Sequence, residues 1–248
     1  MSISQQPTGL SGPARNTGAD FPGVWRANEL AVSRTATYPT GFNAFDNELP
    51  GKGWPRSALI ELLLQQAGVG EMQLLKPVLT GLSRTQKIVL VQPPHLPQAM
   101  ACKNWGVRID NLFWIKTTSA ADGLWATEQI LKNGSCGAVI LWQANVRTES
   151  LRRLHLAAQS TDTWLWLMRP LAAHMDASPA QLRIALRPAA GGVALDIVKR
   201  RGPNTQQLLF IPLVDMPASR HYPEQENAPV VMRTRPAVAA RSDTSLLV

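Results

Sequence analysis

The chain has 248 residues, of which 45% are hydrophobic and 17% are charged, an ordinary globular composition that can bury one sizeable core. Its 25 Lys and Arg exceed its 17 Asp and Glu, and the net charge of +8 favours nucleic acid or an acidic protein as a partner without choosing between them. Two widely separated cysteines, Cys102 and Cys136, and four unclustered histidines argue against zinc and against a disulfide framework. We therefore expect no metal and no cofactor.

The sequence also argues against insertion into a membrane. No apolar run reaches the roughly 18 residues that are needed to span a bilayer. The polar N-terminus lacks the apolar stretch of a signal peptide. We expect a cytoplasmic protein that makes no contact with a membrane.

The predicted elements form a single core between two polar ends. Residues 1–23 are rich in Ser, Gln, Gly, Pro and Thr and are predicted to form a flexible N-terminal arm. Residues 24–213 are predicted to form one core domain. Within it, a helical turn in residues 42–49 is predicted to come before the first core strand. Residues 214–248 lose all periodicity and are predicted to form a disordered C-terminal tail.

Five short apolar runs follow one another through the first part of the core, separated by amphipathic segments. This alternation is typical of a parallel sheet with helices on its faces. Because the runs are almost continuously apolar, the strands are expected to be buried on both sides. The predicted strands are 58–64, 88–92, 112–116, 138–143 and 164–168.

Three amphipathic segments between these runs are predicted to be helices, because their apolar residues recur at helical spacing. The predicted helices are 71–84, 120–133 and 148–159. Pro77 should kink the first helix or shift its start, Gly134 should end the second, and Thr148 should cap the third.

After Pro170 the pattern changes to that of an antiparallel meander. The predicted strands are 182–187, 193–200 and 207–213, with the glycine pair at 191–192 supplying a hairpin turn. The predicted fold class is therefore α/β, with a mixed sheet whose parallel strands come first and whose antiparallel strands come last.

The junction between the first strand and the first helix has the layout of a nucleotide-binding loop. A strand, a glycine-bearing turn and a helix place backbone N–H groups where they can bind phosphate. Gly68 and Gly70 are present, but Gln65 stands where the first glycine of such a loop belongs. Glu71 replaces the phosphate-binding lysine and Met72 replaces the magnesium-binding hydroxyl residue. A carboxylate here should repel phosphate, so we expect a degenerate loop without ATPase activity.

Four motifs occur in a fixed order along the core, and each contributes to one resemblance. They are Leu-Leu-Leu ending at Leu64, Gly-Val-Gly-Glu ending at Glu71, Pro-Pro-His-Leu-Pro ending at Pro97, and Lys-Arg-Arg-Gly-Pro ending at Pro203. In this order and spacing they resemble the ImuA family of translesion-synthesis-associated proteins from bacterial DNA-damage cassettes. Together with the segments 40–46, 53–61, 68–72 and 196–203, which resemble the core of the RecA-type recombinases, they point to one family. The resemblance covers most of the core domain and implies a RecA-like, three-layer fold.

The resemblance also implies a function without catalysis. Pro94 stands where the recombinases place a catalytic glutamate, and Trp142 and Gln143 end the strand that should carry a magnesium-linked aspartate. The implied role is that of an accessory protein in an SOS-type DNA-damage response, which supports error-prone translesion synthesis by docking to a mutasome. The implied partners are an ImuB-type relative of Y-family polymerases, an error-prone replicative-type polymerase, and RecA, and self-association is left open.

A second family shares part of the same core. The segment 72–170 also resembles SulA, the damage-induced cell-division inhibitor that binds FtsZ, so a SulA-like inhibitor is the alternative function. The lead-in at 40–46 and the end of the core at 196–213 are absent from SulA-like chains, which favours the polymerase-accessory role.

Basic residues are concentrated late in the core, where nine Lys or Arg stand against four Asp or Glu between residues 147 and 201. They form either a solvated face of helices and strand ends or a surface that binds DNA or a partner. Lys199 and Arg201 resemble the basic pair that recombinase protomers extend across their mutual interface. The candidate binding residues are Arg147, Arg152, Arg153, Lys199, Arg200 and Arg201.

Overall fold

The computed structural model describes residues 36–202 and 208–213. The predicted arm at 1–23 and the predicted tail at 214–248 lie outside the described residues. Among the described helices, none is both long enough and apolar enough to cross a membrane.

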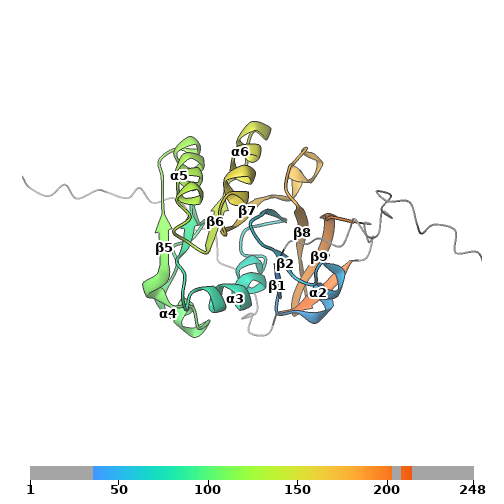
Figure 1. Cartoon of the computed structure of the whole chain (residues 1–248). Coiled ribbons are helices and arrows are strands. Elements are labelled where there is room, and N and C mark those ends of the chain that lie inside the picture. Colours follow the sequence, from blue (N-terminus) through green and yellow to red (C-terminus); the bar gives the residue numbers. More distant parts are fainter. Residues whose placement is uncertain (1–35, 203–207, 214–248) are drawn as a thin grey trace, which may run out of the picture. The chain divides into compact units, whose positions relative to one another are not determined.

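One eight-stranded mixed sheet runs through the core (Figure 1). Its strands are β3 (Leu59–Leu64), β4 (Ile88–Val91), β5 (Leu112–Ile115), β6 (Ala138–Trp142), β7 (Trp164–Pro170), β8 (Leu182–Ala189), β9 (Gly192–Lys199) and β10 (Leu209–Pro212). Their spatial order is β10-β9-β8-β3-β7-β6-β4-β5. The strands from β8 to β5 in this order are mutually parallel, whereas β9 and β10 are antiparallel to their neighbours. The prediction of parallel strands followed by an antiparallel meander is therefore confirmed.

Helices cover both faces of this sheet, which gives three layers (Figure 1). The helices are α2 (Asn43–Glu48), α3 (Glu71–Leu82), α4 (Ala99–Asn104), α5 (Ala120–Asn133) and α6 (Thr148–Gln159). In the view of Figure 1, α5 and α6 lie above the sheet, and α3 and α4 lie below it. Two short 3₁₀ segments, η1 (Ile109–Asn111) and η2 (Leu171–Met175), and a two-stranded ribbon, β1 (Thr37–Tyr38) with β2 (Trp54–Pro55), complete the described part.

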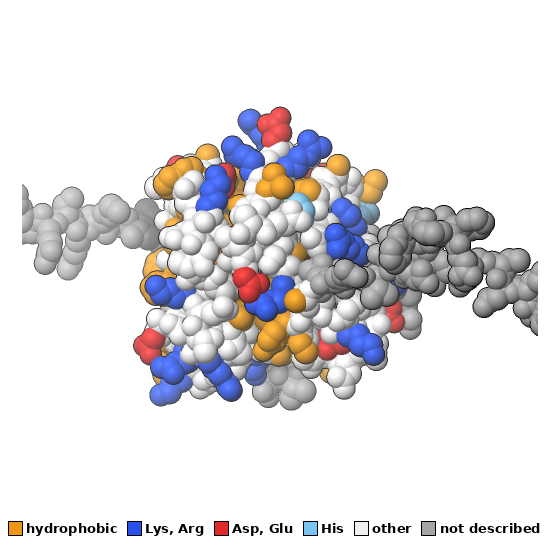
Figure 2. Space-filling view, viewed as in Figure 1, with side chains coloured by type: hydrophobic (Ala, Val, Ile, Leu, Met, Phe, Trp, Pro, Cys, Tyr) orange, Lys and Arg blue, Asp and Glu red, His pale blue; other side chains and the backbone are white. Residues whose placement is uncertain are grey.

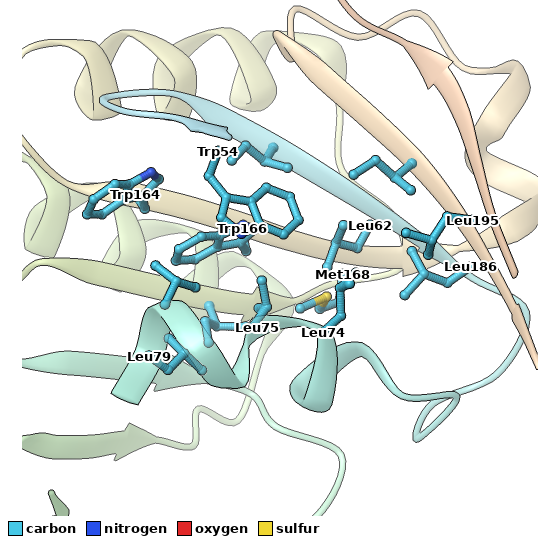
Figure 3. Packing of buried hydrophobic residues seen from close by; sticks show 14 of the residues in the cluster. Trp54, Leu62, Leu74, Leu75, Leu79, Trp164, Trp166, Met168, Leu186 and Leu195 are labelled. Carbon is cyan, nitrogen blue, oxygen red and sulfur yellow. The ribbon is translucent and has the colours of Figure 1, made fainter. Parts of the chain in front are cut away.

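The larger core cluster lies between the sheet and α3 (Figure 3). Because side chains alternate along a strand, Trp164 and Trp166 of β7 point to the same face, where their rings stack with centroids 6.0 Å apart. Trp54 meets Trp166 edge-on at 5.9 Å. Aromatic contacts of these kinds contribute about 0.5–1.5 kcal/mol each beyond the area that they bury.

Most predicted boundaries agree with the structure to within two residues, and α5 agrees at both ends. Gly134 ends α5 with φ of +63°, as predicted, and Ser119 opens the helix by accepting a hydrogen bond from the N–H of Asp122. The two-residue turn between β8 and β9 uses Gly191 at φ +74°. Gly192 instead belongs to β9, where a Cβ atom would lie 2.2 Å from the carbonyl oxygen of Ile211. That glycine is therefore required by the close approach of β10.

Helix α3 starts at Glu71, so Pro77 lies inside the helix and does not shift its start. Two other expectations were wrong. Thr148 does not cap α6, because it is the first helical residue and the N-cap is Arg147, without a side-chain hydrogen bond. The segment 112–116 is not buried on both sides, because β5 is the edge strand of the sheet. Phe113 and Trp114 are consequently 44% and 50% exposed.

Candidate functional site

The loop between β3 and α3 keeps the backbone shape of a phosphate-binding turn. It follows Leu64 at the C-terminal end of β3 and enters α3 at Glu71, so the N–H groups of the helix N-terminus border the loop. Gly68 and Gly70 have φ of +80° and +120°, in the region that favours glycine. The two glycines that the sequence singles out therefore form the turn.

The carboxylate of Glu71 occupies the anion-binding groups of this turn. Its Oε1 accepts a hydrogen bond from the N–H of Gly68 at 2.9 Å, and its Oε2 accepts one from the N–H of Gly70 at 3.1 Å. Glu71 is only 3% exposed and is the first residue of α3, where the helix dipole favours negative charge. Glu71 thus does more than replace a lysine. Its carboxylate binds the backbone N–H groups that would otherwise be open to the phosphate of a ligand.

The other positions compared with the recombinases carry no lysine, hydroxyl or carboxylate side chain. Met72 is half-buried and packs against the large core cluster. Trp142 packs against the same cluster, and the backbone N–H of Gln143 donates to the carbonyl of Met168 at 3.1 Å. Pro94 is exposed and offers no acid or base. In the described part of the chain, no group of three or more His, Cys, Asp or Glu side chains is placed to hold a metal ion.

A buried ion network on the central strand was not foreseen from the sequence. Glu61 of β3 is fully buried, and its Oε2 accepts a hydrogen bond from Nε of Arg183 at 2.8 Å. Its Oε1 accepts one from Oγ of Ser178 at 2.6 Å and lies 3.8 Å from Nη1 of Arg169. Arg169 in turn pairs with Asp176 at 2.6 Å. The available signal was the single charge within the apolar run 59–64, because a buried carboxylate needs a cationic partner.

This network fixes the segment that follows β7. The guanidinium of Arg183 also donates to three backbone carbonyls, those of Ala173, His174 and Asp176, at 2.7–3.2 Å. Removing one member would leave a buried charge without compensation. The network therefore has a structural role, which is to hold η2 and the chain after it against β3 and β8.

The structure divides the six predicted basic residues between two parts of the fold. Arg147, Arg152 and Arg153 are exposed at the start of α6 and along it. Figure 2 shows Lys and Arg side chains gathered at the top of the molecule, with acidic side chains among them. Arg153 lies 3.6 Å from Glu128 of α5. These three arginines are exposed on α6 and at its N-cap.

The other three follow one another at and after the end of β9, where Lys199 and Arg200 have different partners. Arg200 pairs with Glu48 of α2 at 3.5 Å, and its side chain is 12% exposed. Lys199 donates to the carbonyl of Ser178 at 2.8 Å, and burial, together with the charge of Arg183, lowers its pKa. Lys199 and Arg201 both lower the pKa of His155 on α6, after the larger effect of its burial. Lys199 and Arg200 therefore contact different parts of the fold, the segment before β8 and helix α2.

Comparison with known proteins shows no family for this chain. No protein-family model matches the chain, and no curated protein matches it. Among solved structures, SulA from Pseudomonas aeruginosa is similar at 21% sequence identity with a TM-score of 0.39, over 45% of this chain and 97% of the SulA chain. A similarity of this size carries no argument about function.

Proposed function

We propose that the chain is a non-catalytic accessory protein that supports error-prone translesion DNA synthesis in an SOS-type response by docking to a polymerase complex. The observation that carries the absence of catalysis is the carboxylate of Glu71, which binds the N–H groups of Gly68 and Gly70. Phosphate would have to displace a covalently tethered anion and then bind without the lysine and hydroxyl that stabilise it.

The sequence motifs support the biological role. The order of the motifs that end at Leu64, Glu71, Pro97 and Pro203 resembles the ImuA family, whose members act beside polymerases. The proposed partners are accordingly an ImuB-type relative of Y-family polymerases, an error-prone replicative-type polymerase, and RecA. The chain would act by bringing partners together, because the loop between β3 and α3 keeps the shape of a nucleotide-binding loop but lacks its lysine and hydroxyl side chains.

The absence of turnover is tested with purified protein in the presence and absence of DNA. We expect no ATP hydrolysis above that of a blank. The contradicting result is hydrolysis that disappears in a Gly70→Ala variant, because only activity that depends on the loop would belong to this site.

The docking role is tested by recovering a tagged copy of the chain from DNA-damaged host cells and identifying the proteins that accompany it. We expect a Y-family-like polymerase and an error-prone replicative-type polymerase. Recovery of FtsZ instead, together with filamentation of cells on overexpression, would favour the SulA-like alternative suggested by residues 72–170. Cells without DNA damage provide the control for proteins that bind the tag.

A further inference from the structure

A groove of about 420 Å³ lies between α5 and the beginning of α6. Its α5 wall consists of Ala120, Ala121, Leu124, Trp125 and Glu128 and is apolar except at Glu128. The two alanines leave room beside the helix, and Trp125 is 65% exposed. An aromatic side chain of this size at the rim of a groove is a common anchor of protein interfaces.

The opposite wall, from α6 and the segment before it, is cationic. It includes Arg147 and Arg153, whereas Glu128 is the acid that lines the groove. Glu128 is already neutralised, because it pairs with Lys132 at 2.8 Å and with Arg153 at 3.6 Å. Among the described residues, Arg147 forms no ion pair. The groove therefore joins an apolar wall to a wall with uncompensated positive charge.

We propose that this groove binds an acidic peptide segment of a partner protein. One large apolar side chain of the peptide packs against Leu124 and Trp125, and its carboxylates pair with Arg147 and Arg153. The inference rests on the proposed docking function and deepens it by naming the surface and the chemistry of the partner. Carboxylates suit these arginines because guanidinium groups bind them through paired hydrogen bonds.

The charges favour a peptide over the other occupants. A nucleic-acid strand needs a continuous cationic track, whereas the lining of the groove supplies two cations, Arg147 and Arg153. A second copy of this chain is disfavoured, because its net charge of +8 gives it a predominantly basic surface. An acidic segment with an apolar anchor complements both walls.

The groove is tested by panning a random-peptide phage library on the immobilised full chain. We expect the enriched peptides to combine two or more Asp or Glu with a Leu, Phe or Trp. Synthetic copies of the enriched peptides should bind at least about tenfold more weakly to Trp125→Ala and to Arg147→Glu. Matched controls are Trp114→Ala, which alters another exposed tryptophan, and Arg84→Glu, which alters an exposed arginine elsewhere.

Each remaining outcome contradicts the proposal. No enrichment, an enriched set without acidic residues, or equal binding to Trp125→Ala and the wild type would each show that the groove is not an acidic-peptide site. Oligo(dT) that binds the wild type and is lost in both groove variants would assign the groove to single-stranded nucleic acid. All variants alter exposed side chains, and urea unfolding verifies that each is folded.

The test separates this inference from the proposed function. If tagged Trp125→Ala and Arg147→Glu proteins recover the same polymerases as the wild type, the groove assignment is wrong and the docking role stands. If the wild type recovers no polymerase although the peptides bind the groove, the groove assignment stands and the translesion role is wrong.

Discussion

Replacing Glu71 should destabilise the folded chain, although this residue occupies a position where related loops bind a ligand. The carboxylate makes two hydrogen bonds to backbone N–H groups, at 2.9 and 3.1 Å, and is 3% exposed. Hydrogen bonds to a charged group contribute about 1.5–3 kcal/mol each, and a carboxylate at a helix N-terminus contributes about 0.3–1 kcal/mol more. These terms are not additive, since water can reach the exposed Gly68 once the carboxylate is gone.

We therefore expect Glu71→Ala to lower the free energy of unfolding by about 2–4 kcal/mol. Glu71→Gln keeps one acceptor oxygen and should cost about 1–3 kcal/mol. Urea unfolding measures both, and an unchanged slope would show that the change lies in stability rather than in the extent of unfolding. The matched control is Glu149→Gln, which removes an exposed acid from the first turn of α6 and should cost less than about 0.5 kcal/mol.

The reasoning is refuted if Glu71→Ala unfolds within about 0.5 kcal/mol of the wild type, as a surface substitution would. It is also refuted if Glu71→Gln is more costly than Glu71→Ala. A greater loss of stability in Glu71→Gln would mean that the turn is more stable with no side-chain acceptor than with the amide oxygen of Gln. This would contradict the role of the Glu71 carboxylate as the bound anion of the turn.

Four further predictions concern other features of the chain. Glu71→Lys should create no ATP affinity, because the remaining nucleotide-site residues are still absent; saturable binding of a fluorescent ATP analogue would contradict this. Glu61→Gln should lower the free energy of urea unfolding by about 3–5 kcal/mol, because it leaves Arg183 buried without its counter-ion. Replacing both Glu61 and Arg183 by leucine should cost less than the sum of the two single replacements by leucine. Burial, Lys199 and Arg201 lower the pKa of His155, so the unfolded chain binds a proton more readily than the folded chain. The free energy of unfolding should therefore fall as the pH drops below about 6.5. His155→Gln should make this dependence on pH weaker, and an unchanged dependence would rule out His155 as its source. Burial raises the pKa of the Cys136 thiol to about 11. Near pH 8, iodoacetamide should therefore alkylate Cys136 about 100-fold more slowly in the folded chain than in the unfolded chain. Equal rates, measured by mass spectrometry, would show that the thiol is accessible and ionised.

The elements that could be predicted are those whose signals are local. Helix α5 was predicted at both ends, because Gly134 supplies a left-handed stop after a helical pattern. The buried parallel strands were predicted, because continuous apolar runs of strand length have few alternatives. Helix α4 was missed, since its six residues follow a proline-rich stretch that resembles a loop.

The features that could not be predicted depend on neighbours that are distant in the chain. The run 112–115 is as apolar as the interior strands, and only the spatial order of the sheet places it at an edge. Lys199 and Arg200 looked like adjacent surface cations, but Ser178 and Glu48 bind them from different sides. Charge content alone does not reveal such partners.

The candidate loop was predicted in part. The sequence identified the loss of the lysine and of the hydroxyl, and Glu71 was expected to repel phosphate. The hydrogen bonds from Gly68 and Gly70 depend on the turn geometry, which the residue types alone do not specify. From the sequence, position 71 was interpreted as the loss of a lysine. In the structure, the Glu71 carboxylate fills the anion site of the turn.

The tethered carboxylate also bears on how the loop is ordered. A protein that is ordered by a bound nucleotide gains stability in proportion to the logarithm of ligand concentration, so its state follows the supply of that ligand. Glu71 is joined to the loop through the backbone, and its local concentration is fixed once the chain folds. If the loop binds no nucleotide, as we propose, the stability of the chain should not change when ATP is added, which thermal unfolding with and without ATP would measure.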